Sequence, residues 1–358
     1  MGRTPPQNQG QGYRVPAPAP DALIAWPDAF GTRFCVFVDT EEEFDWAAPF
    51  SREAFGTRAI AALPAAHARF VDHGVPLTYL ADYPVASAPV AVEILARLIE
   101  DGRSTLGTQL HPWVNPPFEE EIGDLNSFAG NLALALEGAK LTLLTDTITR
   151  NFGTRPIVYR AGRYGIGPNT LRLLAELGYR VDSSMRPAYD YSSEGGPDFS
   201  RISNHAFRAS PDGAMLELPL TTVFTGGVRA GGAGLYRRLS RIPHACGVAA
   251  RLRLLSRVAL TPEDMPLDEA MEAVRVAVGE GVRLLNFSFH SPSVEPGHTP
   301  YVRDQADLAA FHHWWERIFA LLAGLGVAPA SLSEIVAAAD AACGAAQPSA
   351  SAAGAGGL

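Results

Sequence analysis

The sequence places a dense group of carboxylates directly after a short apolar run. Phe34 to Val38 are apolar, and four of the five residues that follow them are acidic. Asp39 and Glu41 stand two positions apart, so an extended chain directs both side chains to one face. Two such carboxylates at the end of a strand could act as a general base and a metal ligand. A solvated acidic turn is the alternative.

Polar side chains also follow four later apolar runs. They are Gln109 and His111 in LGTQLHPW, Arg160 and Arg163 in YRAGRYG, Asp182 in YRVDSSM, and His290 in NFSFHSPS. Each has an ordinary structural explanation: a packed histidine, a solvated arginine, or an aspartate that caps a turn. Shared chemistry is the alternative, because histidine transfers protons near neutral pH and arginine can hold a carboxylate.

The segments around these residues alternate between two patterns. Strand-like runs are expected at 33–39, 75–84, 104–113, 155–162, 179–185 and 282–290, and helical ones at 51–74, 90–102, 131–153, 168–178, 267–281 and 307–326. Strands that alternate with helices indicate βα units and a parallel sheet. Because the polar residues recur at the carboxyl ends of strands, an α/β fold closed into a barrel is favoured over an open sheet.

Composition and the two ends of the chain set further limits. The net charge of −9 argues against a general nucleic-acid or acidic-membrane surface, and three scattered cysteines provide no disulfide framework. We expect a disordered leader at 1–28, a single domain at 29–337 and a disordered Ala/Gly/Ser tail at 338–358. The sequence contains neither a signal peptide nor an integral membrane segment, so a cytoplasmic location is expected.

Two segments do not fit the alternating pattern. Residues 186–228 are irregular and could cover a pocket as a lid. Residues 240–260 hold several arginines beside apolar side chains, so they could touch a membrane surface or an anionic glycan. A solvated helix with an apolar underside is the alternative for this second segment.

The order of these segments and their polar residues resembles the polysaccharide deacetylase family, the NodB-homology carbohydrate esterases. The resemblance extends from Arg33 to Val336, and VDTE corresponds to a family variant whose first motif is V-D-x-E. It implies a distorted (β/α) barrel of about seven strands. It also implies removal of acetyl groups from N-acetylated sugars with the help of a bound divalent metal ion.

The resemblance suggests catalytic roles motif by motif. Asp39 corresponds to the base of the first motif, and Arg160 to the arginine of the third motif that orients this base. Asp182 corresponds to the fourth motif, which packs near the third, and His290 to the acid of the fifth motif.

The resemblance also suggests a metal site. Glu41 corresponds to a metal ligand of the first motif. The second motif normally supplies two metal histidines four residues apart, but this chain has Gln109 and His111, with Trp113 four residues after Gln109. The implied ligands are therefore Glu41, His111 and Gln109, for zinc or another transition metal. Trp113, Tyr164 and Arg163 are expected to contact the substrate.

The leading hypothesis is therefore a metal-dependent hydrolase that deacetylates a glycan, a glycan precursor or a glycolipid. A metal ion would lower the pKa of its bound water toward about 7, Asp39 would take the water proton, and His290 would protonate the leaving amine. One alternative is hydrolysis of a small cyclic or linear amide on the same barrel. Another is a degenerate, metal-free protein that binds carbohydrate.

Overall fold

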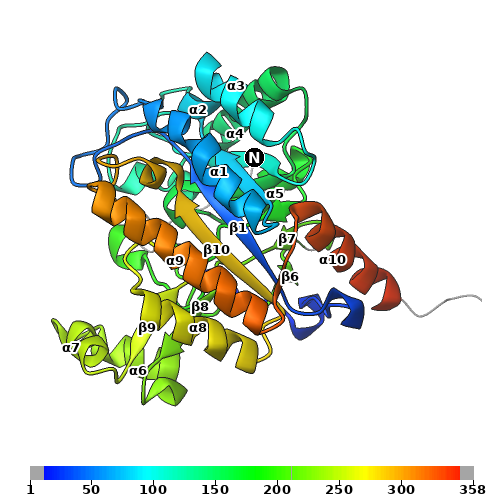
Figure 1. Ribbon diagram of the computed structural model, residues 1–358. Helices are drawn as coiled ribbons and strands as arrows, with labels where there is room; N and C mark the ends of the chain where they lie inside the picture. The colour runs from blue at the N-terminus through cyan, green and yellow to red at the C-terminus, as the bar shows by residue number, and fades with distance from the viewer. Residues whose placement is uncertain (1–11, 211, 347–358) are drawn as a thin grey trace, which may run out of the picture.

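One curled, mainly parallel sheet forms the centre of the computed structural model, which describes residues 12–210 and 212–346 (Figure 1). Its strands run in the order β10-β1-β2-β3-β4-β5-β7-β6, with β11 beside β1. The strands are β1 (Arg33–Thr40), β2 (Leu77–Ala81), β3 (Thr105–Leu110), β4 (Val158–Ala161), β5 (Val181–Asp182), β6 (Phe207–Arg208), β7 (Leu216–Glu217), β10 (Leu284–His290) and β11 (Ala328–Pro329). All neighbours from β10 to β7 are parallel, and only β6 runs antiparallel.

The two ends of the parallel series approach each other after β7. The Thr221 amide donates to the Asn286 carbonyl at 3.2 Å, and the Asn286 side-chain amide donates to the Leu218 carbonyl at 2.9 Å. These bonds connect the chain that follows β7 to β10. The expected distorted barrel is therefore confirmed, with a series of parallel strands closed by irregular backbone.

Helices pack around the sheet, and α9 lies alongside β10 in Figure 1. They are α1 (Leu63–Asp72), α2 (Tyr83–Ser87), α3 (Pro89–Leu98), α4 (Leu134–Phe152), α5 (Thr170–Glu176), α8 (Leu267–Gly279), α9 (Gln305–Gly324) and α10 (Leu332–Ala346). Local signals fix several ends: Asp82 and Asp304 cap α2 and α9, and Gly153 ends α4 in the left-handed conformation at φ 70°.

The alternation of side chains along β1 produces two separate apolar clusters. Val36 and Val38 face outward and belong to the main core with Trp315 of α9. Cys35 and Phe37 belong to the second, inner cluster, together with residues of α10 such as Ile335. Asp39 is the next residue after Cys35 and Phe37 on this inner face, because every second residue of a strand points to the same side. The alternation that fills the barrel interior therefore also directs the Asp39 carboxylate inward at the end of the strand.

Both chain ends are more ordered than the sequence suggests. Residues 12–28 were expected to be disordered, but Val15 is buried and the Ile24 amide donates to the Ala206 carbonyl at 2.9 Å. The Trp26 ring stacks on Phe30 with centroids 4.4 Å apart. The disordered tail expected from residue 338 is also wrong as far as Ala346, where α10 ends. The remaining parts of both predictions, residues 1–11 and 347–358, lie outside the described residues.

The irregular region contains strands that sequence patterns did not predict. After β6 and β7, the chain forms β8 (Thr222–Thr225), α6 (Gly232–Leu239), α7 (Ala245–Arg251) and β9 (Ser256–Ala259). β8 and β9 pair as an antiparallel two-stranded sheet. In Figure 1 the two short helices project away from the barrel. No helix in the described ranges is both long enough and apolar enough to cross a membrane.

Candidate active site

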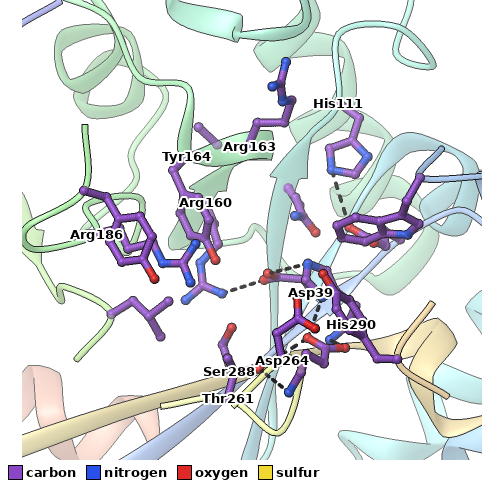
Figure 2. Close-up of a pocket in the computed structure, with 18 of the residues that line it drawn as sticks. Asp39, His111, Arg160, Arg163, Tyr164, Arg186, Thr261, Asp264, Ser288 and His290 are labelled. Atoms are coloured by element: carbon purple, nitrogen blue, oxygen red, sulfur yellow. Dashed lines mark hydrogen bonds and ion pairs between the residues drawn. The ribbon is translucent and has the colours of Figure 1, made fainter. Parts of the chain in front are cut away.

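A pocket of about 330 Å³ lies at the carboxyl ends of the parallel strands (Figure 2). Nine side chains singled out from the sequence line it: Asp39, Glu41, Gln109, His111, Trp113, Arg160, Arg163, Tyr164 and His290. The register of the sheet explains why they meet. Asp39 lies beside His290 on β10, and Gln109 on β3 lies beside Arg160 on β4. Segments separated by more than 200 residues thus contribute to one cavity.

Asp39 is held at the pocket floor by Arg160. Arg160 Nη1 lies 2.6 Å from Asp39 Oδ1, and both side chains are buried. Arg160 Nε donates to the Ser183 carbonyl at 2.8 Å, Nη2 donates to Ser183 Oγ at 3.1 Å, and the guanidinium lies over the Phe37 ring. Because this charge has no access to water, removing one member of the pair would cost about 3–5 kcal/mol. The pair fixes the direction of the carboxylate.

His290 approaches the free oxygen of the same carboxylate. Its Nε2 lies 3.7 Å from Asp39 Oδ2, while Nδ1 lies 2.7 Å from Glu263 Oε2. Burial alone would lower the pKa of His290, but the negative charges of Glu263 and Glu41 outweigh burial and raise it to about 10. The imidazole is therefore positively charged at neutral pH. With Nδ1–H donated to Glu263, the second N–H points toward the pocket.

Three side chains that line the pocket offer donor atoms to a divalent cation. Glu41 Oε1 and Gln109 Oε1 are buried and have no hydrogen-bond partner among the described residues. His111 Nε2 lies 3.6 Å from Glu41 Oε2. Burial raises the pKa of Glu41 to about 8, although the charges of His290 and His111 oppose this shift. Unsatisfied buried oxygens beside an imidazole nitrogen are what a metal ion stabilises, so the expected ligands Glu41, Gln109 and His111 are compatible with one.

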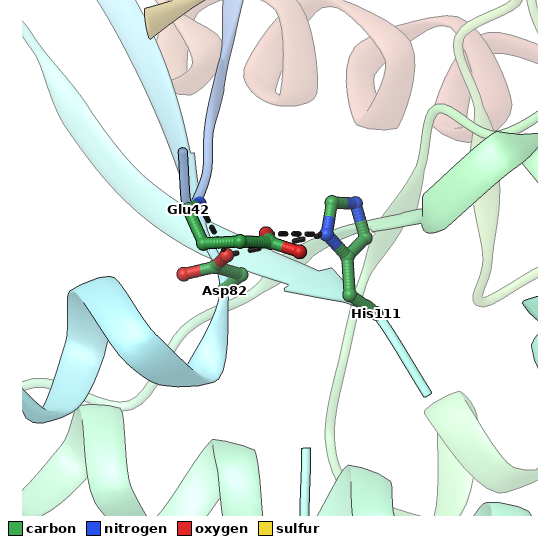
Figure 3. Close-up of side chains that lie close together, drawn as sticks. All are labelled: Glu42, Asp82 and His111. Atoms are coloured by element: carbon green, nitrogen blue, oxygen red, sulfur yellow. Dashed lines mark hydrogen bonds and ion pairs between the residues drawn. The ribbon is translucent and has the colours of Figure 1, made fainter. Parts of the chain in front are cut away.

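A second layer of acids orients His111 (Figure 3). His111 Nδ1 lies 2.7 Å from Glu42 Oε2, and Trp113 Nε1 donates to Glu42 Oε1 at 2.7 Å. The Glu42 amide donates to Asp82 Oδ2 at 2.7 Å, and Asp82 Oδ1 caps α2. Burial and the adjacent Glu42 raise the pKa of Asp82 well above its usual range.

These three residues, Glu42, Asp82 and His111, are close enough to form a metal site of their own. However, the oxygens of Glu42 and Asp82 already accept hydrogen bonds from the imidazole, the indole and the backbone. We therefore interpret the group as a support for His111. Donation of Nδ1–H to a carboxylate leaves the Nε2 lone pair free for the pocket, which is how metal-binding histidines are commonly oriented.

Asp182 does not line the pocket. The register pairs it with Tyr159, so it shares the outward face of the sheet, whereas its neighbour Ser183 points inward to Arg160. The Asp182 carboxylate accepts a hydrogen bond from Ser184 Oγ and lies beside Glu217. Burial raises the pKa of both acids. The position of Asp182 therefore gives no support to the expectation that it takes part directly in catalysis.

The expected substrate contacts differ in how they are held. Trp113 lies in the pocket wall, where its ring stacks on His111 at 4.4 Å. Arg163 is tied outward by Ser127 and by Glu194, 2.6 Å from its Nη2. Arg163 and Tyr164 have φ values of 53° and 59°, a left-handed conformation that is costly for residues with a Cβ. Strain at two successive pocket residues is typical of functional loops.

Sequence reasoning missed several residues that line or support the pocket. Glu42 belongs to the acidic run after Val38, but its imidazole and indole partners, on His111 and Trp113, are distant in sequence. Glu263 follows β9, a strand that the apolar pattern did not reveal. The other missed residues include Asp82, Arg186 and Tyr301.

Comparison with solved structures supports the fold. No protein-family model matches this chain, and no curated protein matches it. A protein from Mycobacterium smegmatis provisionally described as a polysaccharide deacetylase superposes with a TM-score of 0.53 and 18% identity, covering 90% of this chain and 95% of the other. Puue allantoinase superposes with a TM-score of 0.52 and 16% identity, covering 92% and 99%. This chain is therefore similar in fold to both proteins over most of its length.

Proposed function

We propose that this protein is a hydrolase that cleaves the C–N bond of an N-acyl group, with an N-acetylated sugar as the preferred class of substrate. The observation that carries the proposal is the arrangement at the pocket floor. One carboxylate, Asp39, is bound through Oδ1 to a buried arginine and faces a charged imidazole through Oδ2. Amide hydrolysis requires a base for water and an acid for the leaving amine, and this arrangement can supply both.

Asp39 is suited to remove a proton from the attacking water. Arg160 occupies its Oδ1 at 2.6 Å, which leaves Oδ2 directed toward the cavity. Because Arg160 is itself held by the Ser183 carbonyl and hydroxyl, the donor that orients the carboxylate has a fixed position. A fixed base within reach of a bound water contributes about 10²–10⁴ to the rate.

His290 is suited to protonate the departing nitrogen. Glu263 accepts from its backbone amide at 3.1 Å and also bonds Nδ1, so the ring has one orientation and Nε2–H enters the pocket. When the C–N bond breaks, the nitrogen takes this proton while Asp39 retains the proton taken from water. The neutral imidazole then remains hydrogen-bonded to Glu263. Proton exchange with solvent restores both groups.

Glu41, Gln109 and His111 would hold a divalent metal ion in this pocket. When bound, such an ion polarises the acyl oxygen and makes a nearby water more acidic. The chain itself contributes the orientation of these ligands through Glu42, which fixes the His111 ring. The amide oxygen of Gln109 is a harder, weaker donor than a second imidazole, so we expect lower zinc affinity than for a site with two histidines.

Aromatic side chains around the opening support a sugar-sized substrate. Trp46 is 37% exposed, and its ring meets His290 edge-on with centroids 4.8 Å apart. Tyr301 contacts the same indole, so the two rings form one wall above the acid. Aromatic faces at the edge of a small cavity can stack on the apolar face of a pyranose ring.

A second candidate function is hydrolysis of a small cyclic amide. It is favoured by the likeness to Puue allantoinase, which covers 92% of this chain, and by a cavity of only about 330 Å³. Two assays distinguish these functions. Release of acetate from N-acetylated sugars would indicate the first, and ring opening of cyclic ureides would indicate the second. Activity on the second class alone would replace the first proposal.

Asp39→Asn tests the proposal itself. We expect at least a hundredfold loss of kcat, because Asn keeps the shape of the side chain but cannot accept the proton from water. Since this change also leaves Arg160 without its counter-charge, the melting temperature must be compared, and His290→Gln provides a second variant that leaves the arginine pair intact. Wild-type rates in both folded variants would refute the assigned roles. Sugar binding without turnover in the wild type would instead indicate a degenerate carbohydrate-binding protein.

A further inference from the structure

The lobe formed by residues 226–254 has almost no interior of its own. It comprises α6, α7 and their connections, and projects from the barrel in Figure 1. Ala249 is the only buried residue in this span, and α6 buries none. Five large apolar side chains are exposed by 42–63%: Val228, Ile242, Val248, Leu252 and Leu254. Exposed apolar residues gathered on one small element indicate an interaction site.

The charge of this region is opposite to that of the whole protein. No acidic residue occurs between Glu217 and Glu263, although the chain carries a net charge of −9. The same interval contains seven arginines: Arg229, Arg237, Arg238, Arg241, Arg251, Arg253 and Arg257. The lobe is therefore a basic, apolar extension of an acidic protein.

Most of these arginines have no counter-charge among the residues that the structure describes. Arg229 pairs with Glu280, which follows α8, at 3.0 Å, and Arg253 pairs with Asp268 of α8 at 3.1 Å. Within the described ranges, the other five arginines form no ion pair, and four of them are exposed on the lobe: Arg237, Arg238, Arg241 and Arg251. Their charges remain available to an external anionic surface.

We propose that this lobe docks on a lipid bilayer that carries anionic headgroups. Arginines can keep their charge at the phosphate level while Ile242, Val248 and Leu252 enter the boundary with the acyl chains. A nucleic acid would use the arginines but would leave these aliphatic side chains in water. A bilayer surface satisfies both kinds of side chain, and the local charge explains how it can do so despite the negative net charge.

Docking would bring the pocket close to the membrane surface. Arg257 of β9 lies over the Tyr189 ring at 3.5 Å and over the Tyr236 ring at 4.8 Å. Tyr189 lines the pocket and Tyr236 belongs to α6, so this stack joins the lobe directly to the pocket wall. If the proposed hydrolase function holds, its substrate class is then an N-acyl group on the headgroup of a glycolipid.

The test uses the full-length protein with two kinds of vesicle, pure phosphatidylcholine and phosphatidylcholine with about one-third phosphatidylglycerol. We expect co-sedimentation with the anionic vesicles only, weakened by high salt. Each neutralised lobe arginine should lower partitioning about fivefold, so a double R237Q/R241Q variant should bind about 25-fold more weakly. Ile242→Ser with Leu252→Ser should also weaken binding, at unchanged charge.

A matched control replaces arginines of similar exposure outside the lobe. Arg97→Gln and Arg172→Gln, on α3 and α5, should leave vesicle binding unchanged. No binding to anionic vesicles, or equal loss in the lobe and control variants, would overturn the proposal. Two other results would also overturn it. Concentration-dependent self-association that Leu252→Ser abolishes would identify a second copy of the chain as the partner. Binding to a soluble polyanion that persists in the serine variant would identify such a polyanion as the partner.

The outcomes for docking and for hydrolysis can be separated. Lobe variants should hydrolyse a soluble N-acyl substrate at the wild-type rate, since none of the substituted side chains lines the pocket. Asp39→Asn should abolish hydrolysis but bind anionic vesicles like the wild type. Failure of vesicle binding alone would remove the docking surface and leave the proposed active site standing.

Discussion

The charge state of His290 depends on a single carboxylate that can be neutralised without changing the shape of the site. Glu263 is 5% exposed at its side chain and lies 2.7 Å from His290 Nδ1, and its second oxygen accepts from Ser293 Oγ at 2.5 Å. Glu263→Gln keeps an acceptor oxygen for the histidine but removes the negative charge. If Glu263 is the main source of the raised pKa, this variant must lower it.

The size of the expected change follows from the contact. A hydrogen bond to a charged partner contributes about 1.5–3 kcal/mol, and each pKa unit corresponds to about 1.4 kcal/mol. The pKa of His290, which is raised to about 10 in the wild type, should therefore fall by about one to two units. Because the folded-state pKa stays above that of free histidine, the ring remains mostly protonated at neutral pH. The rate at pH 7 should change much less than the rate at pH 9.

Two measurements check this prediction. Ring resonances of isotopically labelled histidine, followed from pH 5 to 11 in chelator-treated protein, report the pKa of His290 directly. In the pH profile of kcat/KM, the basic limb should move to lower pH by the same number of units. Glu316→Gln is the control, because it removes a carboxylate 2.9 Å from the surface residue His73 and should leave His290 unaffected.

Three results would refute the reasoning. The first is a wild-type pKa of His290 near that of free histidine, which would mean that burial outweighs the surrounding acids. The second is a pKa in Glu263→Gln within about 0.3 units of wild type, which would assign the shift to Glu41 or Asp39 instead. The third is a basic limb of the rate profile that stays in place while the histidine pKa moves, which would mean that His290 is not the acid.

Two further predictions concern stability and ligand geometry. Burial raises the pKa of Glu137 to about 7, so between pH 4.5 and 7 this carboxyl binds more protons in the folded state than in the unfolded one. Urea unfolding should therefore show the wild type losing about 3 kcal/mol more stability over this window than Glu137→Gln, in which the other buried acids still titrate. Gly162→Ala would place a Cβ against the Cδ2 of His111 and 2.7 Å from the Leu110 carbonyl oxygen, which should displace the imidazole. Metal affinity measured by calorimetry should therefore drop at least tenfold. Gly123→Ala is the control, because its Cβ would meet open space and its metal affinity should match the wild type.

The sequence identified much of the site because the relevant information is local. In a strand, residues two apart share a face, so the pairs Asp39–Glu41 and Gln109–His111 could be assigned to a common side before any fold was known. The carboxyl ends of parallel strands meet at one end of a barrel, which predicted that His290 would join them. Both expectations depend only on the alternation of side chains along a strand and on the parallel direction of the strands.

The same local reasoning could not assign Asp182 or the chain ends. Asp182 follows an apolar run as Asp39 does, but its register with Tyr159 places it on the opposite face of the sheet. Residues 12–28 look disordered by composition, yet they are ordered because β6 and its surroundings offer partners such as the Ala206 carbonyl. Register and the availability of distant partners are not encoded in the composition of the segment itself.

By itself, the sequence determined the βα alternation, the barrel, and most of the residues that meet in the pocket, because side-chain period and apolar runs are properties of neighbouring residues. Only the tertiary structure decided which carboxylate supports which histidine of the pocket. Glu42 hydrogen-bonds His111, 69 residues away in sequence, and Glu263 hydrogen-bonds His290, 27 residues away. It also decided that seven arginines in an acidic chain gather around one projecting lobe. Proton affinities and surface potentials depend on distances between such segments, which only the folded chain establishes.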